Sequence, residues 1–499
     1  MNSADQFKQL PERVRDLGHF INGKKIEAGH RKTSERVSPG FGHAVTRTTL
    51  CTPQDVEDAV NAARAAERAG VWSRVASSVR AGVLLKTAAL VREHLEELAY
   101  WEMLESGKPI SQAKAEMGGV ADHFEFAAGA ARTLHGEAFN NLGEDMLGIV
   151  TRQPVGVVGV ITPWNFPLIV LAERVPYILA SGNSVVIKPS EMTSATTVMI
   201  AEIMQEAGLP DGVFNVVTGS GSVVGQLMAE HMDIDMISFT GSTAIGAKVL
   251  AASCSNFKKA ALELGGKNPQ IVFADADLDD AADGVAFGLC FNAGQCCVSG
   301  SRLIVEASVA TEFQAKLVEK LSRVKIGDCF DPETQMGAIA SEDHQEKIFS
   351  YVELAKTEGA EVVTGGHPIT IGKGRFMAPT LLTGMNNSMR VAQEEIFGPV
   401  LAMITFTDFD EALQIANDSP YGLAASIWTK DIDKGLRAMR QVEAGRTWIN
   451  TTIAGGPELP TGGFKQSGTG RETGVLGIEE YTEVKSTHIA IGKRNHWVK

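Results

Sequence analysis

Short β-branched runs alternate with helical segments between residues 155 and 253. The runs "VGVVGVI", "SVVIK", "FNVVT" and "DMISFT" each precede turn residues, and this pattern predicts four strands. Between the second and third runs, "TSATTVMIAEIMQEAGLPDG" begins with Thr and Ser capping candidates and stops at Gly208, with Pro210 just beyond. That segment is typical of a crossover helix, so the region is predicted to form βαβ units with a parallel sheet.

A second alternation begins near Leu262 and extends to about residue 450. Its strand-like runs "GPVLAMITF", "GLAASIW" and "GRTWIN" are separated by helical patterns over residues 408–417 and 431–442, which predicts a second α/β unit. Two more strand-like runs, "MLGIVTRQPV" and "YTEVKSTHIAIG", lie outside both units. Strands in such positions often pair across subunits, and an edge hairpin within one monomer is the alternative.

Composition narrows the class of partner. The 499 residues suffice for about three domains, and the formal net charge of −14 comes without any basic block. A nucleic-acid partner is therefore not expected. The polar N-terminus lacks the apolar segment of a secretory signal, and the most apolar region, residues 156–180, is interrupted by prolines and charges, so no membrane partner is expected either. A small-molecule partner is favoured.

The six cysteines are sparse, with no CxxC pair and no Cys/His run of metal-site spacing. Neither a disulfide framework nor a metal site is predicted, and a reducing, cytoplasmic location is favoured. The stretch "FNAGQCCVSG" nevertheless places Cys296 beside Cys297 in a glycine-bearing loop. Neighbouring Cα atoms lie about 3.8 Å apart, less than a disulfide usually spans, so these thiols are not expected to be bridged to each other. The loop alone leaves a thiolate nucleophile and inert buried thiols as alternatives.

Seven motifs occur in a fixed order along the chain. They are "TPWNFP" (162–167), "KPSE" (188–191), "FTGSTAIG" (239–246), "LELGGKNP" (262–269), "FNAGQCCVSGSR" (291–302), "EEIFGPV" (394–400) and "GGFKQSGTGRE" (462–472). With them the chain resembles the aldehyde dehydrogenase superfamily, from "FING" near its start to "YTEVK" near its end. The resemblance implies an α/β fold with a Rossmann-like NAD-binding domain over 1–133 and 154–262, and a second α/β catalytic domain over 263–475. It also implies a small β oligomerisation element over 134–153 and 476–499, in a homodimer or homotetramer.

The resemblance implies NAD-dependent oxidation of an aldehyde to its carboxylic acid. The family's nucleophile position falls on Cys297, with Cys296 as a variable neighbour that packs beside it. A thiolate that adds to the carbonyl forms a thiohemiacetal, and loss of hydride leaves a thioester. By resemblance, the Asn165 amide and the backbone N–H of Cys297 hold the oxyanion, and Glu263 is the general base that activates water. Relatives that transfer the acyl group to coenzyme A lack this glutamate, so hydrolysis to a free acid is expected.

A cofactor site is predicted at the end of the run "DMISF". The following "TGSTAIG" opens a helix, so Gly241, Ser242 and the helix N-terminus can face a pyrophosphate. By resemblance, Lys188 and Glu191 contact the adenosine ribose. The Glu191 carboxylate would repel a 2′-phosphate, which favours NAD over NADP and leaves NADP use open. The resemblance adds three cofactor residues, of which the last two hold the nicotinamide end: Trp164, Glu395 and Phe397.

The substrate side is less well defined by the sequence. Many relatives carry Trp-Lys where this chain has Glu173-Arg174, and aromatic residues where it has Gly455 and Thr461. Glu173 and Glu458 would offer negative charge to the tail of a polar or charged aldehyde, and local pairing of Glu173 with Arg174 is the alternative. The run "GGFKQSGTGRE" is interpreted as structural, near the substrate entrance. The candidate substrate residues are Phe166, Val170, Glu173, Phe291 and Thr461, with Ile169 also on the apolar wall.

Three other functions are alternatives to this one. An NADP-preferring semialdehyde dehydrogenase is opposed by Glu191, and a coenzyme-A-acylating one by Glu263. A non-catalytic binding or structural protein on the same scaffold would carry a damaged site, whereas Cys297, Glu263 and Asn165 are all present.

Overall fold

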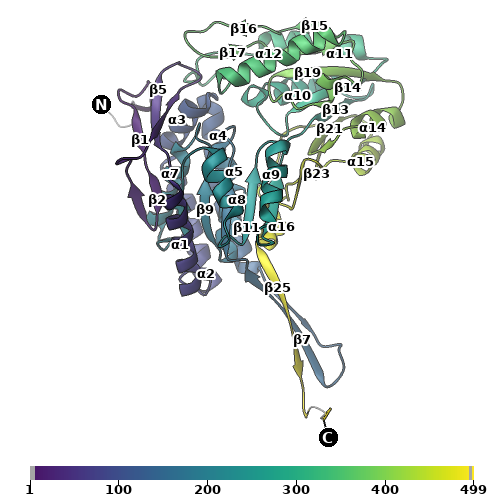
Figure 1. The fold of residues 1–499 in the computed structure, drawn as a ribbon. Coiled ribbons are helices and arrows are strands. Elements are labelled where there is room, and N and C mark those ends of the chain that lie inside the picture. Colours follow the sequence, from purple (N-terminus) through teal and green to yellow (C-terminus); the bar gives the residue numbers. More distant parts are fainter. Residues whose placement is uncertain (1–5, 494–496, 499) are drawn as a thin grey trace.

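The computed structural model describes residues 6–493 and 497–498. The predicted cofactor-binding domain begins at residue 1 and the predicted oligomerisation element ends at residue 499, so residues 1–5, 494–496 and 499 of these predictions lie outside the described residues. Within the described residues, no helix combines the length and the apolar character that a membrane crossing requires. The chain forms two α/β units with a slender arm that projects from one end (Figure 1). The predicted α/β class is confirmed.

The first unit is built on an eight-stranded sheet, with strand order β24-β12-β11-β8-β9-β10-β2-β3 among the described residues. The four predicted strands are present and run parallel to one another, whereas β2 pairs antiparallel with the last of them, β10. Each is buried along most of its length because helices cover both faces of the sheet, as parallel sheets require. Its strands are β2 (His19–Ile21), β3 (Lys24–Ile26), β8 (Val157–Ile161), β9 (Ser184–Lys188), β10 (Phe214–Val216), β11 (Met236–Thr240), β12 (Lys259–Glu263) and β24 (Gly468–Thr469).

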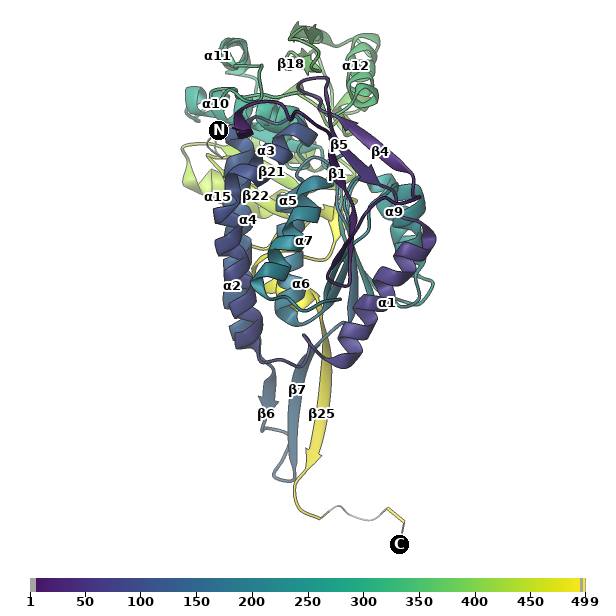
Figure 2. The ribbon, with the colours of Figure 1, turned by 90° about the vertical axis from the view of Figure 1, so that its left-hand side faces the viewer.

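The helices of the first unit form a layer on each face of this sheet, with α2, α4 and α7 on one side and α1 on the other (Figure 2). The predicted crossover helix α7 ends at Gly208, whose φ of 104° is one that glycine adopts freely. The prediction that a serine caps the start of this helix is wrong, because the Ser194 hydroxyl donates to the Ser190 carbonyl. The carboxylate of Glu105 serves in its place, with Oε2 accepting from the Ala195 N–H at 2.9 Å. The helices are α1 (Pro53–Ala69), α2 (Ser77–Glu93), α3 (Leu95–Ser106), α4 (Ile110–Thr133), α5 (Pro167–Ala172), α6 (Val175–Ser181), α7 (Ala195–Ala207), α8 (Gln226–Glu230), α9 (Thr243–Ser253) and α16 (Gly474–Glu480).

The second unit is a seven-stranded sheet of order β15-β18-β19-β14-β13-β21-β22, parallel except at β15. This confirms the second predicted α/β alternation. Its strands are β13 (Asn268–Val272), β14 (Gly300–Glu306), β15 (Glu361–Thr364), β18 (Thr380–Thr383), β19 (Val400–Phe406), β21 (Ala424–Trp428) and β22 (Arg446–Ile449). Its helices are α10 (Leu278–Cys290), α11 (Ala310–Arg323), α12 (Glu342–Thr357), α13 (Arg390–Gln393), α14 (Phe409–Asn417) and α15 (Ile432–Gln441).

The arm is a three-stranded sheet of β25 (Thr482–Ala490), β7 (Met146–Pro154) and β6 (Glu137–Phe139). Strand β25 pairs antiparallel with β7 over its whole length, from Thr482 opposite Pro154 to Ala490 opposite Met146. The two strand-like runs outside the α/β units therefore pair with each other within one chain, and pairing across subunits stays a prediction. The other short strands are β1 (Arg15–Leu17), β4 (Thr33–Val37), β5 (Ala44–Thr49), β16 (Pro368–Ile369), β17 (Phe376–Met377), β20 (Tyr421–Gly422) and β23 (Phe464–Lys465).

Candidate active site

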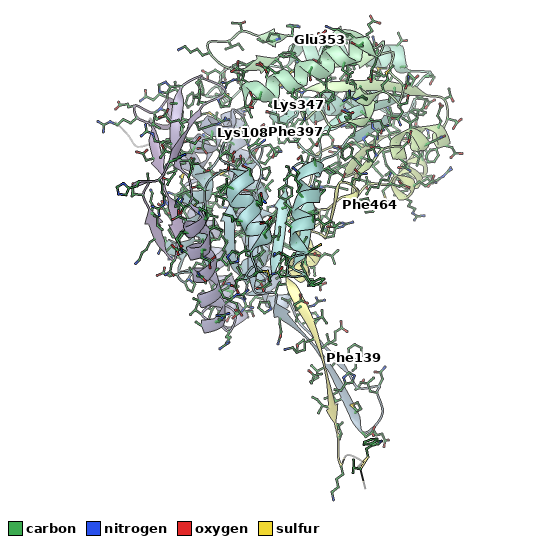
Figure 3. All side chains as sticks on the ribbon, viewed as in Figure 1. Lys108, Phe139, Lys347, Glu353, Phe397 and Phe464 are labelled. Carbon is green, nitrogen blue, oxygen red and sulfur yellow. The ribbon has the colours of Figure 1, made fainter. Side chains whose placement is uncertain are left out.

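A cleft of about 230 Å³ lies where the two units meet, and Figure 3 shows Lys347 and Phe397 in that region. It receives side chains from the ends of β8, β11 and β12, from the loop after α10, from α12 and from the segment before β19. The sequence prediction missed His344 and Lys347, because "SEDHQEK" indicates only a helix start. The lining residues are Pro163, Trp164, Asn165, Val170, Thr240, Gly241, Ser242, Leu264, Gly265, Cys297, His344, Lys347, Glu395 and Phe397.

The loop that carries Cys297 is held in an unusual backbone conformation. Asn292 and Ala293 follow α10 with φ of 50° and 55°, in the left-handed region that side chains other than glycine adopt rarely. Gly294 is tightly enclosed, since a Cβ there would lie 2.4 Å from the carbonyl carbon of Gly398. The Gln295 side chain fixes the loop from the other side, where its Oε1 accepts from Ala340 N at 2.8 Å. The position of the Cys297 thiol is therefore determined by packing rather than by regular secondary structure.

Asn165 lies against this loop and is buried. Its Nδ2 donates to the Gln295 carbonyl at 3.0 Å, and Asn292 Nδ2 donates to the Asn165 carbonyl at 2.9 Å. A side-chain amide has two N–H groups, so one remains after the bond to Gln295. The amide is thus oriented before substrate arrives, with a donor left for an oxygen in the cleft, as an oxyanion site requires.

Cys297 and Cys296 differ in their surroundings. Cys297 is half-buried and lines the cleft, whereas Cys296 is buried against Phe166 and Val170. The hydrogen bond with the Cys296 thiol, together with burial, raises the pKa of Cys297 well above its ordinary value. The resting form of Cys297 is therefore the thiol, and a base is needed to generate the thiolate.

Glu263 is the last residue of β12 and does not line the cleft, although it is close enough for its charge to interact with that of Cys297. Its side chain is buried, and its Oε1 has no hydrogen-bond partner within the described part of the chain. Burial raises the pKa of Glu263 well above its usual range, although the nearby Arg174 guanidinium opposes the shift. A buried carboxylate oxygen without a donor is suited to accept a proton from a thiol or a water.

Three aromatic rings form one wall of the cleft. Trp164 meets both His344 and Phe397 edge to face, with ring centroids 5.2 and 5.4 Å apart. Burial lowers the pKa of His344 to about 4, so the ring is neutral, and its Nε2–H donates to the Phe397 carbonyl at 2.7 Å. That bond supports Phe397 at a φ of 62°, a strained value for a residue with a side chain.

The glycines of the cleft bring backbone close to polar groups. A Cβ on Gly265 would lie 2.3 Å from Glu395 Oε2, and Gly266 N donates to Glu395 Oε1 at 3.0 Å. The predicted role of Gly241 needs refinement, because its N–H donates to the Glu263 carbonyl at 3.1 Å and is not directed at a ligand. Helix α9 begins after Ser242, whose hydroxyl caps the Ile245 N–H, so the N–H groups of Thr243 and Ala244 at the start of the helix are those suited to a pyrophosphate.

Lys188 and Glu191 lie beyond the cleft, at the end of β9. Lys188 is buried; its Nζ donates to the Pro189 carbonyl at 2.8 Å and lies 3.8 Å from Glu191 Oε2. Glu191 is exposed. The carboxylate is therefore held at the surface by its neighbour while remaining open to a ligand hydroxyl.

Two of the residues predicted to form an apolar substrate wall, Phe166 and Phe291, stack on each other with a cation behind them, and neither is among the residues that line the cleft. Phe166 stacks on Phe291 with centroids 5.7 Å apart, and Lys108 Nζ lies 4.7 Å from the centroid of Phe166. Lys108 is fully buried and donates to Glu116 at 2.5 Å, and Glu102 accepts from the Leu168 N–H at the start of α5. This buried charge group fixes the turn that carries Asn165 and Phe166. Phe291 also borders a separate cleft of about 350 Å³ beside α10 and α11.

Glu173, a predicted substrate residue, is not among the residues that line the cleft. It is partly exposed and lies 3.8 Å from Arg174, but the buried Arg174 is closer to Glu472, at 3.3 Å. Its charge contributes to the raised pKa values of both Cys297 and Glu263, which places it near these two side chains. Thr461 lies outside the cleft, in a backbone bridge with Glu472.

Comparisons with known proteins agree with this geometry. A family model described as "Aldehyde dehydrogenase family" matches residues 26–487. Betaine aldehyde dehydrogenase of Bacillus subtilis is 42% identical over 472 residues, which are 94% of this chain and 96% of that protein. A crystal structure of an NAD-dependent aldehyde dehydrogenase from Sinorhizobium meliloti shares 47% identity at a TM-score of 0.96, covering 98% of this chain and 97% of that one. Betaine aldehyde dehydrogenase from Staphylococcus aureus, solved with NAD⁺, shares 37% identity at a TM-score of 0.95, covering 100% and 99%.

Proposed function

The chain belongs to the aldehyde dehydrogenase family, and on that premise we propose that Cys297, Asn165 and Glu263 convert an aldehyde to its carboxylic acid with NAD as cofactor. The single observation that carries this assignment is the convergence of a cleft-facing thiol, an oriented amide with a spare N–H and a buried carboxylate oxygen without a donor. The Cys297 and Glu263 variants described in the Discussion test it.

The residues divide the chemistry among them. Cys297, as the thiolate, adds to the carbonyl carbon, and the oxygen becomes an anion held by Asn165 Nδ2–H and the Cys297 N–H. NAD, when bound, accepts the hydride. Glu263 then takes a proton from the water that attacks the thioester, the acid is released as the carbon–sulfur bond breaks, and the proton passes from Glu263 to the departing Cys297 sulfur. Because the chain has this glutamate, we favour hydrolysis over acyl transfer to coenzyme A.

The cofactor residues fit NAD in their donor chemistry. The start of α9 offers backbone N–H groups to a pyrophosphate, and the close approach at Gly265 leaves Glu395 on the cleft wall for a ribose hydroxyl. Lys188 and Glu191 would hold the adenosine ribose, while Trp164 and Phe397 would enclose the nicotinamide end. We propose the domain division on the same basis, with cofactor binding by 1–133 and 154–262 and catalysis by 263–475.

Removing the negative charge of Glu191 should relax cofactor choice. In Glu191→Gln, kcat/KM with NADP should rise about fivefold or more, because about 1 kcal/mol of repulsion between the carboxylate and a 2′-phosphate is lost even in water. The measurement is initial rate against NAD and NADP. Glu206→Gln, an exposed glutamate at the end of α7, is the control. If the ratio of kcat/KM for NADP to kcat/KM for NAD did not change, Glu191 would not contact the adenosine ribose.

We propose that the substrate carries a positive charge on its tail. Glu173 lies near the reacting groups, and its charge also reaches the buried His123 and Tyr177. The charge of Glu458, which is exposed, likewise acts to raise the pKa values of His123 and Tyr177. Arg446 opposes the influence of these two carboxylates on His123. Relatives that match over nearly the whole chain include enzymes named for betaine aldehyde, a cation.

The charge of Glu173 can be tested with paired substrates. In Glu173→Gln, kcat/KM for a quaternary-ammonium aldehyde should fall about tenfold, which corresponds to about 1.4 kcal/mol of lost attraction. An uncharged aldehyde of the same shape, with a tert-butyl group in place of trimethylammonium, is the matched control and should react as in the parent protein. Equal losses for both aldehydes would show that Glu173 acts on the site's structure, and no loss would show that it does not meet the substrate.

We propose a homodimer or homotetramer assembled through the arm. Most of β25 is exposed in the single chain, and the arm carries exposed Phe139, Val484 and Ile489 away from both cores. Large apolar side chains on a projecting sheet are typical of a contact with another subunit.

The six free thiols favour a reducing compartment, and we propose the cytoplasm.

Deleting the arm strand should release monomers. A chain that ends at Glu483 lacks nearly all of β25, so sedimentation velocity should give the mass of one chain. A chain that ends at Gly492 keeps the strand and serves as the control, with its assembly unchanged. If the shorter chain sedimented like the longer one, the arm would not be the assembly element.

A further inference from the structure

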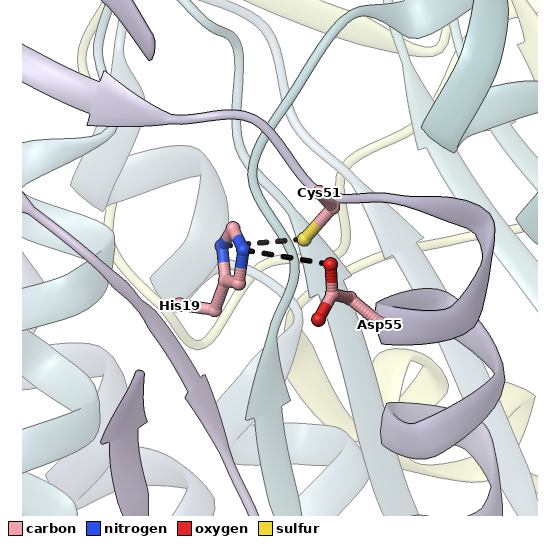
Figure 4. Close-up of side chains that lie close together, drawn as sticks. All are labelled: His19, Cys51 and Asp55. Carbon is pink, nitrogen blue, oxygen red and sulfur yellow. Dashed lines mark hydrogen bonds and ion pairs between the residues drawn. The ribbon is translucent and has the colours of Figure 1, made fainter. Parts of the chain in front are cut away.

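Buried titratable side chains meet at several places outside the cleft. His19, Cys51 and Asp55 do so between β2 and α1, where Cys51 Sγ lies 3.2 Å from His19 Nδ1 and the Asp55 carboxylate accepts several hydrogen bonds from nearby residues (Figure 4). These contacts hold β2 against the start of α1. Another group is centred on Lys108, in the turn between α3 and α4, and Figure 3 shows Lys108 in the region where the two units meet. This second group borders Phe166 and therefore the turn that carries the oxyanion donor.

Lys108 is enclosed by two carboxylates and an aromatic ring. Its side chain is 1% exposed and is not among the residues that line the cleft. Its Nζ donates to Glu116, lies 3.5 Å from Glu102 Oε1 and lies 4.7 Å from the centroid of the Phe166 ring. A buried charge needs such partners, and a cation at this distance is attracted to the face of the ring. Lys108 is therefore held firmly beneath the turn that carries Asn165.

The Glu102 carboxylate connects Lys108 to the backbone that follows Asn165. Its Oε1, the oxygen nearest Lys108, accepts from the Leu168 N–H at 3.3 Å, and its Oε2 accepts from the Thr196 hydroxyl at 2.8 Å. Leu168 lies in the first turn of α5, where backbone N–H groups have no acceptor within the helix. The backbone on the C-terminal side of Asn165 is therefore held by the same buried group.

The ring of Phe166 joins this turn to the loop that carries Cys297. Phe166 stacks on Phe291 with the ring planes 23° apart, and Phe291 is the residue at which the loop leaves α10. Phe166 also packs against Cys296, the neighbour of Cys297. Lys108, Phe166 and Phe291 thus form a stack that crosses from the first unit to the second.

A second contact across the same boundary runs through the backbone. The carbonyl of Gly107, next to Lys108, accepts from the Ala338 N–H at 2.8 Å, and the Ala338 carbonyl accepts from Gln295 Nε2 at 3.3 Å. The Gln295 carbonyl is the group to which the Asn165 amide donates. The turn between α3 and α4 is therefore connected both to the segment that holds the oxyanion donor and to the loop that holds the thiol.

We propose that Lys108 is a positioning residue, which sets the place of Asn165 Nδ2 relative to Cys297 Sγ across the boundary of the two units. This inference rests on the proposed function, in which the amide and the thiol act on one carbonyl group. Without the ammonium, two buried carboxylates would face each other beneath the turn, and the turn would shift to separate or hydrate them. A displacement of about 1 Å in such a site can cost about 10²-fold in rate.

The test variant combines Lys108→Met with Glu116→Gln, so that the net charge of the buried group is unchanged and its volume is nearly kept. Rapid mixing with saturating aldehyde and NAD measures the rate of the NADH burst, and thermal unfolding shows that the variant is folded. We expect the burst rate to fall by about 10- to 10²-fold while the Kd for NAD stays that of the parent. Lys114→Met is the matched control, because that lysine pairs with Glu96 at the surface, and it should keep the parent burst.

A double-mutant cycle identifies the group through which Lys108 acts. In an Asn165→Ala background the amide is already absent, so the Lys108→Met/Glu116→Gln pair should change the remaining burst rate by less than about threefold. Alkylation of Cys297 by iodoacetamide needs no oxyanion donor and should keep the parent rate. A parent-like burst in the paired variant, or an equal loss with and without Asn165, would overturn the proposal.

Two further variants keep the test decisive. If the paired variant fails to fold, Glu102→Gln keeps the shape of the group and weakens only the connection from Lys108 to Leu168. Its burst should fall by about three- to tenfold, again only where Asn165 is present, and an unchanged burst would contradict the positioning role. Cys297→Ser separates this inference from the proposed function: if that variant kept its turnover, the proposed function itself would fail, whereas loss of turnover there with a parent-like burst in the Lys108 variant would remove only the positioning role.

Discussion

Replacing Cys297 with serine should lower dehydrogenase turnover by about 10⁴-fold or more, the scale seen when an enzyme loses its covalent nucleophile. A serine hydroxyl is a far weaker nucleophile than a thiolate near neutral pH. The measurement is steady-state NADH formation with saturating aldehyde and NAD. Cofactor binding, followed by quenching of protein fluorescence, should remain because the thiol is not among the groups assigned to NAD.

The matched control for this variant is Cys296→Ser. Cys296 is buried against Phe166 and Val170, so its replacement should cost some stability and keep most of the turnover. Equal losses in the two variants would mean that the reactive thiol has been assigned to the wrong neighbour.

Glu263→Gln should lower steady-state turnover by about 10² or more, the range typical of losing general base catalysis. The amide keeps the shape of the carboxylate but cannot accept the proton of the deacylating water, so the thioester should form and then persist. Rapid mixing with enzyme in excess should therefore still yield up to one NADH per active site. Wild-type turnover in this variant would require the proposed mechanism to be withdrawn.

The pH dependence separates two roles of Glu263. A base acts in its deprotonated form, so burial, which raises its pKa, should make parent turnover fall as the pH drops through that raised value. The Gln variant should lack this acid limb. If Glu263 also ionises Cys297, the NADH burst of the variant should be slow and should recover as the pH approaches about 8.5, the pKa of a free thiol. A fast burst at neutral pH would assign Glu263 to deacylation alone.

The sequence predicted the two sheets well because their strands are buried on both faces. Runs such as "VGVVGVI" are apolar without interruption, which is the pattern that a central parallel strand requires. The cap of α7 was predicted incorrectly because its donor is satisfied by Glu105, ninety positions away in the chain, and no local pattern encodes such a contact. Ser194, the local candidate, bonds backwards to Ser190 instead.

The residues of the candidate site also fall into two groups: those that lie in distinctive local motifs, and those that only the fold brings to the cleft. Asn165, Cys297 and Glu395 lie in motifs whose local sequence is distinctive, and the structure brings them to one cleft. His344 reaches that cleft from α12, and neither its residue type nor its spacing distinguishes it from a helix-start residue. Lys108 is hidden for a different reason: a lysine is usually exposed, and only the fold reveals that it is buried behind Phe166.

The arm, described above as a sheet that leaves both cores, also determines how local stability is distributed in the chain. Most of β25 is exposed, so its backbone hydrogen bonds to β7 are protected by pairing alone and not by burial. Such a ribbon opens at a small fraction of the free energy needed to unfold a core strand such as β8. In a single chain its amide hydrogens should exchange with solvent first, and protection there should increase with protein concentration as subunits associate. The hydrogen-exchange rate of the β25 amides would then report the extent to which subunits have associated.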